Sequence, residues 1–407
     1  MHKKILVTAV AAALLVPAIC AAQEEGRGKG AWDANVVELY GRVYPELVRP
    51  SGRDATPAGT PVATFAGTPT GESGIIKRTE MQSSNSRFGV RGQEALGRDL
   101  KAIFQLETEF HPDSNDSAFA QRDSFVGLSG RHWGDIKLGR MDTPFKKYGD
   151  ELSFLGISSG NFVSSSNVLR KTGFGTSSAS SFHLRRANVI EYESPHIAGF
   201  HGAVQYSTDE TDTPTRHPHV WSEAIEWAAR GLKVSLAHEE HWDLFGGSKN
   251  VPSSMSNTND QNVRSKDKAT QVMVQYKIGA HTIEGDWIRK EYNENAAVTG
   301  RFSSYKNNAY EVVWSARWTR AWRTQLEYIK AFKGSCSRVN AVCSTDGLDG
   351  SQLQAGFSYY FSPRTYLFVI GAILKNGFSA RYNNMDLQAP SVGEDITQYA
   401  IGLNTSF

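Results

Sequence analysis

The most constraining feature of this sequence is a regular separation of apolar from charged side chains. In residues 86–93, apolar residues alternate with arginine, glycine and glutamine, and in residues 101–110 they alternate mainly with lysine, glutamine and glutamate. The turn at 94–98 joins these segments, so the pattern predicts a β-hairpin with one apolar face and one charged face. Ile103 is the single apolar residue on the charged face. If such hairpins form a closed sheet, the apolar face can meet lipid and the charged face can line water.

The beginning of the chain has the pattern of a secretory signal peptide. A positively charged start precedes an apolar stretch over residues 5–19, and the small residues 20–22 offer a cleavage site. One alternative is a membrane anchor, for which the apolar stretch is short. Another is a lipoprotein attached through Cys20, which the bulky preceding residue disfavours. We expect residues 1–22 to be removed and residues 23–407 to form the exported protein.

Charge and hydropathy exclude several classes of protein. Without Lys3 and Lys4, the 44 basic residues become 42, which equals the 42 acidic residues. This neutral balance gives no electrostatic support for a nucleic-acid partner. Beyond residue 22, no apolar run approaches the roughly 18 residues of a membrane-spanning helix. The exported chain is therefore expected to be either soluble or a β-barrel, and no helical stretch is long enough for a second domain.

Sixteen segments show the alternation of half-apolar strands. Short connections alternate with long ones, as in a barrel with periplasmic turns and external loops. An even strand number also lets the first and last strands pair, which removes exposed sheet edges. The segment at 364–375 is apolar on both faces, which alternation does not explain. The predicted strands lie near residues 35–48, 84–93, 99–110, 119–130, 134–140, 186–193, 200–208, 220–228, 231–242, 269–277, 280–291, 307–319, 321–333, 350–361, 364–375 and 395–407.

The connection at about 141–185 differs from the other long loops. Those are rich in small and polar residues, whereas this one carries several large apolar residues, among them Phe145, Phe154 and Phe162. A loop of this content should fold against a surface, and the inner wall of the barrel is the surface available. The sequence therefore predicts an all-β, 16-stranded antiparallel transmembrane barrel whose constriction loop folds inward.

A set of motifs in this order resembles the general-diffusion porins of Gram-negative outer membranes, most closely the β-proteobacterial type. The resemblance spans the whole exported chain. The matching motifs are VELYGR at 37–42, SRFGVRG at 86–92, LKAIFQLE at 100–107, RDSFVGLS at 122–129, LGR at 138–140, YESP at 192–195, SPRT at 362–365 and the terminal Phe407.

The resemblance implies a homotrimer of sixteen-stranded barrels, each with a third external loop that narrows the pore. It implies a water-filled channel in the outer membrane for passive diffusion of small hydrophilic solutes and ions. Outer-membrane lipid and lipopolysaccharide are the implied surroundings. The aromatic C-terminal strand that ends at Phe407 is the implied signal to the outer-membrane assembly machinery.

The resemblance also suggests which residues face the pore waist. By motif position, Arg42, Arg87 and Arg122 match the basic ladder of the family, and Arg185 or Arg186 would be its next member. Alternation independently places the first two on the water-facing side. Opposed charges across a narrow waist orient dipolar solutes and tune ion preference. The alternative for any one arginine is a solvated charge with no special role.

The opposing acids are expected on the constriction loop. Asp150 and Glu151 are the candidates, and Arg91 is a further basic candidate on the face of the ladder. Lys146 and Lys147 lie on the same loop and leave it less acidic. We therefore expect the channel to lean towards anions.

Other chemistry has little support in the sequence. Cys336 and Cys343 lie in a stretch rich in glycine and serine, and in an oxidising compartment they are candidates for a loop disulfide. The alternative is two free thiols. No spaced ligand set or catalytic motif occurs, so we expect no metal, no cofactor and no enzyme activity. Two other functions stay open, a substrate-selective channel on the same fold and a non-channel surface barrel such as an adhesin.

Overall fold

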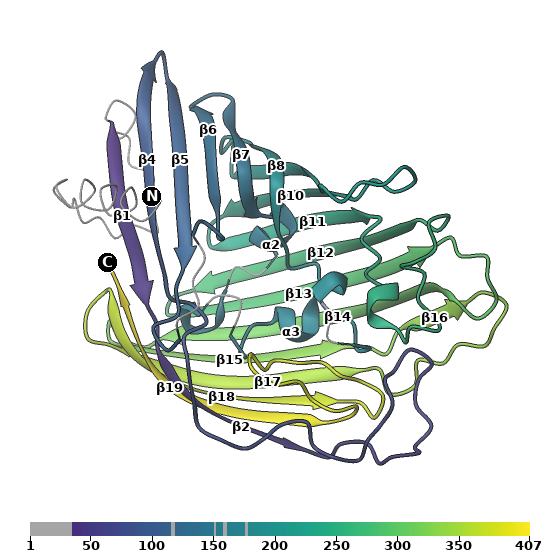
Figure 1. Ribbon diagram of the computed structural model, residues 1–407. Coiled ribbons are helices and arrows are strands. Elements are labelled where there is room, and N and C mark those ends of the chain that lie inside the picture. Colours follow the sequence, from purple (N-terminus) through teal and green to yellow (C-terminus); the bar gives the residue numbers. More distant parts are fainter. Residues whose placement is uncertain (1–34, 115–118, 150–151, 158–160, 176–177) are drawn as a thin grey trace, which may run out of the picture.

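The computed structural model describes residues 35–114, 119–149, 152–157, 161–175 and 178–407 (Figure 1). Within these ranges the strands form one antiparallel sheet that closes on itself. The strands are β1 (Val36–Val43), β2 (Glu46–Arg53), β3 (Glu80–Gln82), β4 (Arg87–Gly97), β5 (Leu100–Glu109), β6 (Ser124–Gly130), β7 (Gly134–Asp142), β8 (Arg185–Glu193), β9 (Phe200–Thr208), β10 (His219–Ala229), β11 (Leu232–Trp242), β12 (Ser265–Ile278), β13 (His281–Glu294), β14 (Phe302–Arg317), β15 (Trp322–Ala331), β16 (Ser335–Arg338), β17 (Gly350–Tyr360), β18 (Thr365–Asn376) and β19 (Asp395–Ser406).

The nineteen described strand segments make a barrel of sixteen strands. The pairs β1–β2 and β3–β4 are each one interrupted barrel strand, since β19 pairs with both β1 and β2. The short β16 pairs with β14 at its loop-side end, whereas β15 pairs directly with β17. The closed antiparallel barrel and the order of its strands are therefore as predicted from the alternation.

Helices in the described ranges are short. They are α2 (Pro144–Lys147), α3 (Ser166–Leu169) and the 3-10 turns η1 (Phe154–Gly156), η2 (Ser178–Ser180) and η3 (Ser248–Asn250). No helix of the described residues is long and apolar enough to cross a membrane.

Some predicted boundaries are wrong at the loop-side ends of the strands. The segment predicted at 119–130 becomes a strand only at Ser124, because Ala120 adopts a left-handed backbone conformation. Conversely, β12 begins at Ser265 and β14 at Phe302, earlier than the alternation indicated. Polar residues continue on both faces at these strand ends, so hydrophobic alternation stops before the strand does.

The opening hairpin shows the predicted division between lipid and water. Phe88 and Leu106 are exposed on the outer face, whereas Lys101 and Glu107 are buried on the inner face. The register aligns Val90 with Leu106 and Arg91 with Gln105, so like faces meet across the pair. The hairpin is therefore β4 and β5 of the barrel wall.

The barrel closes where the C-terminus meets the first strand. The backbone N–H of Gly41 donates to the carbonyl of Phe407 at 3.1 Å, and the N–H of Phe407 donates back to Gly41 at 3.0 Å. Further along, β19 pairs with β2 from Asp395 to Gly402. Because this seam is paired over both halves of the first strand, the described barrel has no free edge there.

We expect Gly41→Ala to weaken this seam. A Cβ atom at Gly41 would lie 2.6 Å from the carbonyl oxygen of Arg87 and 2.7 Å from Cζ of Phe407. Such overpacking costs about 1–3 kcal/mol. When samples are heated in steps before SDS electrophoresis, the band of the folded barrel should therefore disappear at a lower temperature than for the unmodified protein. Gly285→Ala is the matched control, since its Cβ would meet nothing closer than 3.9 Å. Equal melting of the two variants would contradict this account of the seam.

The described residues of the segment at 143–184 fold inside the barrel and explain why the predicted strand at 364–375 is apolar on both faces. The inward face of β18 packs against apolar residues of this loop, while its outward face points to lipid. The ring of Phe368 also stacks on Tyr44 with centroids 4.8 Å apart. We call this group the loop-anchoring cluster. It consists of Tyr44, Val48, Phe154, Leu155, Ile157, Phe162, Val163, Tyr366, Phe368, Ile370, Ala372 and Ala400.

The first external loop also packs inward, over the mouth of the barrel. Its Phe65 contacts the rings of Phe174 and Phe302. The backbone N–H of Thr64 donates to the carbonyl of Ser344 at 3.0 Å, and the N–H of Ser344 donates to the Thr64 hydroxyl at 2.8 Å. Next to Ser344, Cys343 is joined to Cys336 by a disulfide, with Cα atoms 5.8 Å apart.

Candidate pore constriction

Two arginines from adjacent barrel strands lie side by side on the inner wall. Arg42 of β1 is directly opposite Arg87 of β4 in the register. The Arg42 guanidinium donates to the carbonyls of Asn85 at 3.3 Å and Gly156 at 3.0 Å, so it links the wall to the inward loop. Nε of Arg87 lies 3.6 Å from the Glu107 carboxylate. Both residues therefore occupy the inner-wall positions that the alternation predicted.

Arg122 joins this pair from just before β6. Its guanidinium contacts Glu107 at 2.5 Å and Glu109 at 3.1 Å. The Glu107 carboxylate also accepts a hydrogen bond from the hydroxyl of Tyr40 at 3.0 Å. Glu107 thus contacts Arg87, Arg122 and Tyr40. Its negative charge offsets the repulsion between the neighbouring arginines and holds them in place.

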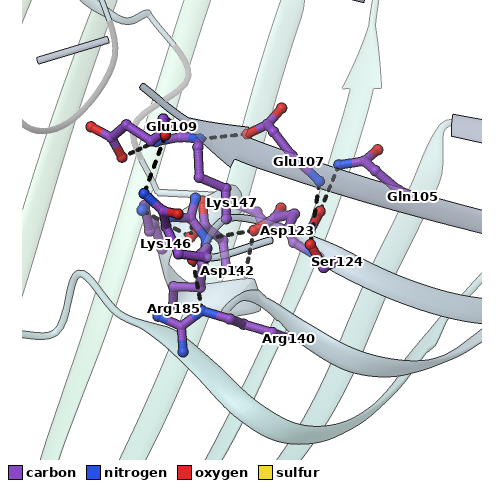
Figure 2. A network of polar contacts seen from close by, with 12 residues as sticks. Gln105, Glu107, Glu109, Asp123, Ser124, Arg140, Asp142, Lys146, Lys147 and Arg185 are labelled. Carbon is purple, nitrogen blue, oxygen red and sulfur yellow. Dashed lines mark hydrogen bonds and ion pairs between the residues drawn. The ribbon is translucent and has the colours of Figure 1, made fainter. Parts of the chain in front are cut away.

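A second group surrounds Asp123 and Asp142 (Figure 2). Arg185, at the start of β8, bonds to Asp123 at 2.6 Å and Asp142 at 2.9 Å. Lys146 of α2 bonds to Asp142 at 2.9 Å, and burial lowers the pKa of its ammonium. Arg140 donates to the carbonyl of Gln121 at 2.7 Å. The inward loop and the wall are therefore connected by charged groups of both signs.

Lys147 completes the basic side. It lies on α2 and bonds to Glu191 of β8 at 2.7 Å. We call these residues the constriction cluster. It consists of the basic residues Arg42, Arg87, Arg122, Arg140, Lys146, Lys147 and Arg185 and the acidic residues Glu107, Glu109, Asp123, Asp142 and Glu191.

Two predicted basic residues contact other partners. Arg91 bonds to Glu38 at 2.8 Å and lies over the ring of Tyr40, two strand repeats from Arg87 towards the periplasmic turn. Arg186 bonds to Asp209 at 3.2 Å, beyond β9. A register shift between β7 and β8 separates Arg186 from the regular alternation. The predicted acids Asp150 and Glu151 lie outside the described residues.

A set of acids that the sequence analysis did not single out lies on the inner wall of β13 to β15. By strand order these strands are four to six places from β1 around the barrel. Their inner-wall acids are between 0% and 3% exposed, beneath the inward loop. The backbone N–H of Leu152 donates to one of them at 3.1 Å. These acids are Glu284, Asp286, Glu311 and Glu327.

Two fully buried cations fasten the inward loop. Arg170 donates to the carbonyl of Gly149 and to Gln271 of β12 at 3.1 Å. Lys290 of β13 donates to the carbonyls of Leu169 at 2.7 Å and Lys171 at 2.6 Å. Alternation could have placed Lys290 on the inner face, but it could not have identified loop carbonyls as its partners.

We expect protonation of His183 to weaken the docking of the inward loop at low pH. Nδ1 of His183 lies 3.1 Å from the Arg170 guanidinium and accepts its hydrogen bond. Burial and the nearby cations, including Lys146, hold the pKa of His183 well below its usual range. Since the undocked loop would bind the proton more readily, docking should weaken as the pH falls below about 6.5.

Open-channel current noise recorded from pH 7.5 to pH 5 checks this prediction. The noise should rise in acid for the unmodified protein. His183→Gln keeps a hydrogen-bond acceptor but does not titrate, so its noise should stay constant. The same acid response in both proteins would assign the effect to another group.

Comparisons with known proteins agree with this architecture. A family model described as Gram-negative porin matches residues 8–377. The major outer membrane protein P.IB of Neisseria gonorrhoeae is 26% identical over 316 residues, which cover 74% of this chain and 81% of that protein. An outer membrane porin protein of Bordetella pertussis is 31% identical over 133 residues, which cover 32% of each.

Solved structures share the fold. The anion-selective porin from Comamonas acidovorans superposes with a TM-score of 0.68 at 21% identity, over 92% of this chain and 100% of that chain. The trimer form of OmpT from Vibrio cholerae gives a TM-score of 0.63 at 16% identity, over 92% and 100%.

Proposed function

The chain belongs to the Gram-negative porin family, and we propose that its channel prefers anions weakly and is narrowed by the constriction cluster. As a porin it is an outer-membrane channel for passive diffusion of small hydrophilic solutes. The relative from Comamonas acidovorans is described as anion-selective, which fits the proposed preference.

The observation that carries this proposal is the charge balance of the constriction cluster, which has seven basic and five acidic residues. Both signs reach the water: the side chains of Arg87 and Lys147 are 25% and 28% exposed, and those of Glu109 and Asp123 are each 23% exposed. The acids on β13 to β15 are at most 3% exposed, so they contribute less to the field in the water-filled path. The net positive charge of the cluster therefore favours anions at short range.

The remaining expectations are part of the same proposal. Residues 1–22 direct export, and residues 23–407 form a single barrel that assembles as a homotrimer in contact with lipopolysaccharide. A trimer is described for OmpT of Vibrio cholerae. Phe407, through its place at the seam, signals to the assembly machinery. We further propose that the protein has no enzymatic activity and acts only as a channel.

Reversal potentials in a planar bilayer with a potassium chloride gradient test the proposal. We expect stepwise ohmic conductance. The reversal potential should shift from zero towards the equilibrium potential of chloride. Strong cation selectivity would refute the anion preference. Saturable block by one solute would favour a substrate-selective channel, and the absence of steps would favour a surface barrel without a pore.

A further inference from the structure

A pocket of about 570 Å³ lies between two of the long loops, at residues 243–264 and 295–301. These loops join β11 to β12 and β13 to β14, on the same side of the barrel as the inward loop. Serine, threonine and asparagine side chains make up much of the lining, together with Lys249, Asp260 and Arg301. A pocket of this size can hold a small molecule. Its polar lining favours a hydrophilic one.

Arg216, from the neighbouring loop between β9 and β10, fixes the wall of the pocket. Its guanidinium donates hydrogen bonds to the carbonyls of Thr258 at 2.7 Å and Asn257 at 3.1 Å. It also donates to the carbonyl of Val263 at 3.3 Å, and it lies 4.1 Å from the ring centroid of Phe245. A planar guanidinium has five donors, so one side chain can hold several carbonyls at once. The segment at 243–264 is therefore held at several points along its length.

The other side of the pocket is fixed by β13 and by the loop that follows it. The Asn257 amide donates to the Glu294 carboxylate at 2.7 Å. Arg301 donates to the carbonyls of Ser256 at 2.6 Å and Ser253 at 3.3 Å. The lining is thus positioned by contacts within the protein, which reduces the entropy lost when a ligand binds.

Positive charge exceeds negative charge in the pocket. Lys249 and Arg301 line it together with one carboxylate among the described residues, that of Asp260. In the part of the chain that the structure describes, neither cation pairs with a carboxylate: Arg301 bonds to backbone carbonyls, and Lys249 is exposed. Both charges are therefore available to a ligand, and their excess of one over Asp260 favours a monoanion.

We infer that this pocket, which we call the external-loop pocket, binds a hydroxylated carboxylate of the size of a sugar acid. The two cations attract the carboxylate. The hydroxyls of Ser253 and Thr258 and the amide of Asn259 can each donate and accept hydrogen bonds, so they suit the hydroxyl groups of a sugar. Val251 adds a small apolar surface for the C–H groups of the ring. That the pocket opens to the cell exterior rests on the proposed outer-membrane channel.

Calorimetric titration of the folded protein in detergent, with galacturonate as the probe, tests the inference. Galactose has the same ring without the carboxylate, so it should bind about tenfold more weakly. Lys249→Gln should lower the affinity for galacturonate about tenfold, towards that for galactose, and Lys249→Arg should restore it. Lys77→Gln is the matched control. It removes an exposed lysine of the first external loop, outside the pocket, and should bind galacturonate as the unmodified protein does.

A free sugar acid and the acidic end of a glycan share this chemistry. Tighter binding of digalacturonate than of galacturonate would support the inference with a glycan as the source. Tighter binding of galacturonate would support it with a free sugar acid as the source.

Equal affinities for galacturonate and galactose, or equal affinities of Lys249→Gln and Lys77→Gln, would overturn the inference. Competition by inorganic phosphate at equal concentration would also overturn it, because the pocket would then be an unspecific anion site. So would the absence of measurable heat from every sugar. Calorimetry does not require a conducting pore, whereas bilayer recording of the unmodified protein does. Failure of this inference is therefore distinguishable from failure of the proposed channel.

Discussion

Arg87→Glu is expected to turn the weak anion preference into cation preference. The substitution changes the charge at a partly exposed position of the constriction cluster by two units, beside Arg42 and 3.6 Å from Glu107. A unit charge about 6 Å from the ion path contributes about 0.7 kcal/mol even in water. Two such units should change the chloride-to-potassium permeability ratio at least about tenfold. Reversal potentials at 0.1 M and 1 M salt measure the change, which should shrink at the higher concentration because of screening.

Arg91→Glu is the matched control for this experiment. It lies on the same strand and face, but it is four residues nearer the periplasmic turn, outside the constriction cluster, and it bonds to Glu38 at 2.8 Å. We expect a much smaller change in selectivity from it. If the two substitutions act equally, the selectivity is distributed along the lumen and the constriction cluster does not control it.

Leu155→Asp should release the inward loop and widen the pore. Leu155 is fully buried in the loop-anchoring cluster, and its backbone N–H donates to Gln325 at 2.9 Å. Loss of its side chain alone costs about 2–5 kcal/mol, and a buried charge adds to this cost. The barrel wall should persist, because its hydrogen bonds do not depend on this side chain. Single-channel conductance should rise about twofold or more, since the narrowest section limits conduction.

Leu155→Met separates the effect of charge from that of substitution. This exchange nearly conserves volume and usually costs less than about 1.5 kcal/mol. Its conductance should match that of the unmodified protein. Unchanged conductance in Leu155→Asp, with the folded band intact on unheated gels, would mean that the loop is held chiefly by polar contacts such as those of Arg170 and Lys290.

Much of the wall could be predicted from the sequence because each strand meets lipid on one side and water on the other. This two-sided solvent forces Phe88 and Leu106 outward and Arg87 inward, and the alternation records it directly. The same rule fails where the inner face does not meet water. The inner face of β18 is apolar because it faces the loop. Phe368 and Ile370 therefore stand at positions where the alternation would place polar residues.

The partners within the constriction could not be predicted in the same way. Arg185 meets Asp123 and Asp142 through three separate segments of the chain, and no local spacing encodes that meeting. Lys290 and Arg170 bind backbone carbonyls, which carry no sequence signature. The motif positions nevertheless singled out Arg42, Arg87 and Arg122, and their place at the pore waist stays a prediction.

The position of the loop-anchoring cluster has a consequence for the timing of assembly. The cluster joins Tyr44 and Val48 of the first barrel strand to Phe368 of β18 and Ala400 of the last strand, and loop residues lie across all of them. The surface that receives the loop is therefore incomplete until the first and last strands have met. A barrel still open at this seam would also lack its narrow waist. Closure of the seam thus completes both the barrel and the surface that holds the constriction loop. A subunit inserted before this closure would be a wide channel without its constriction.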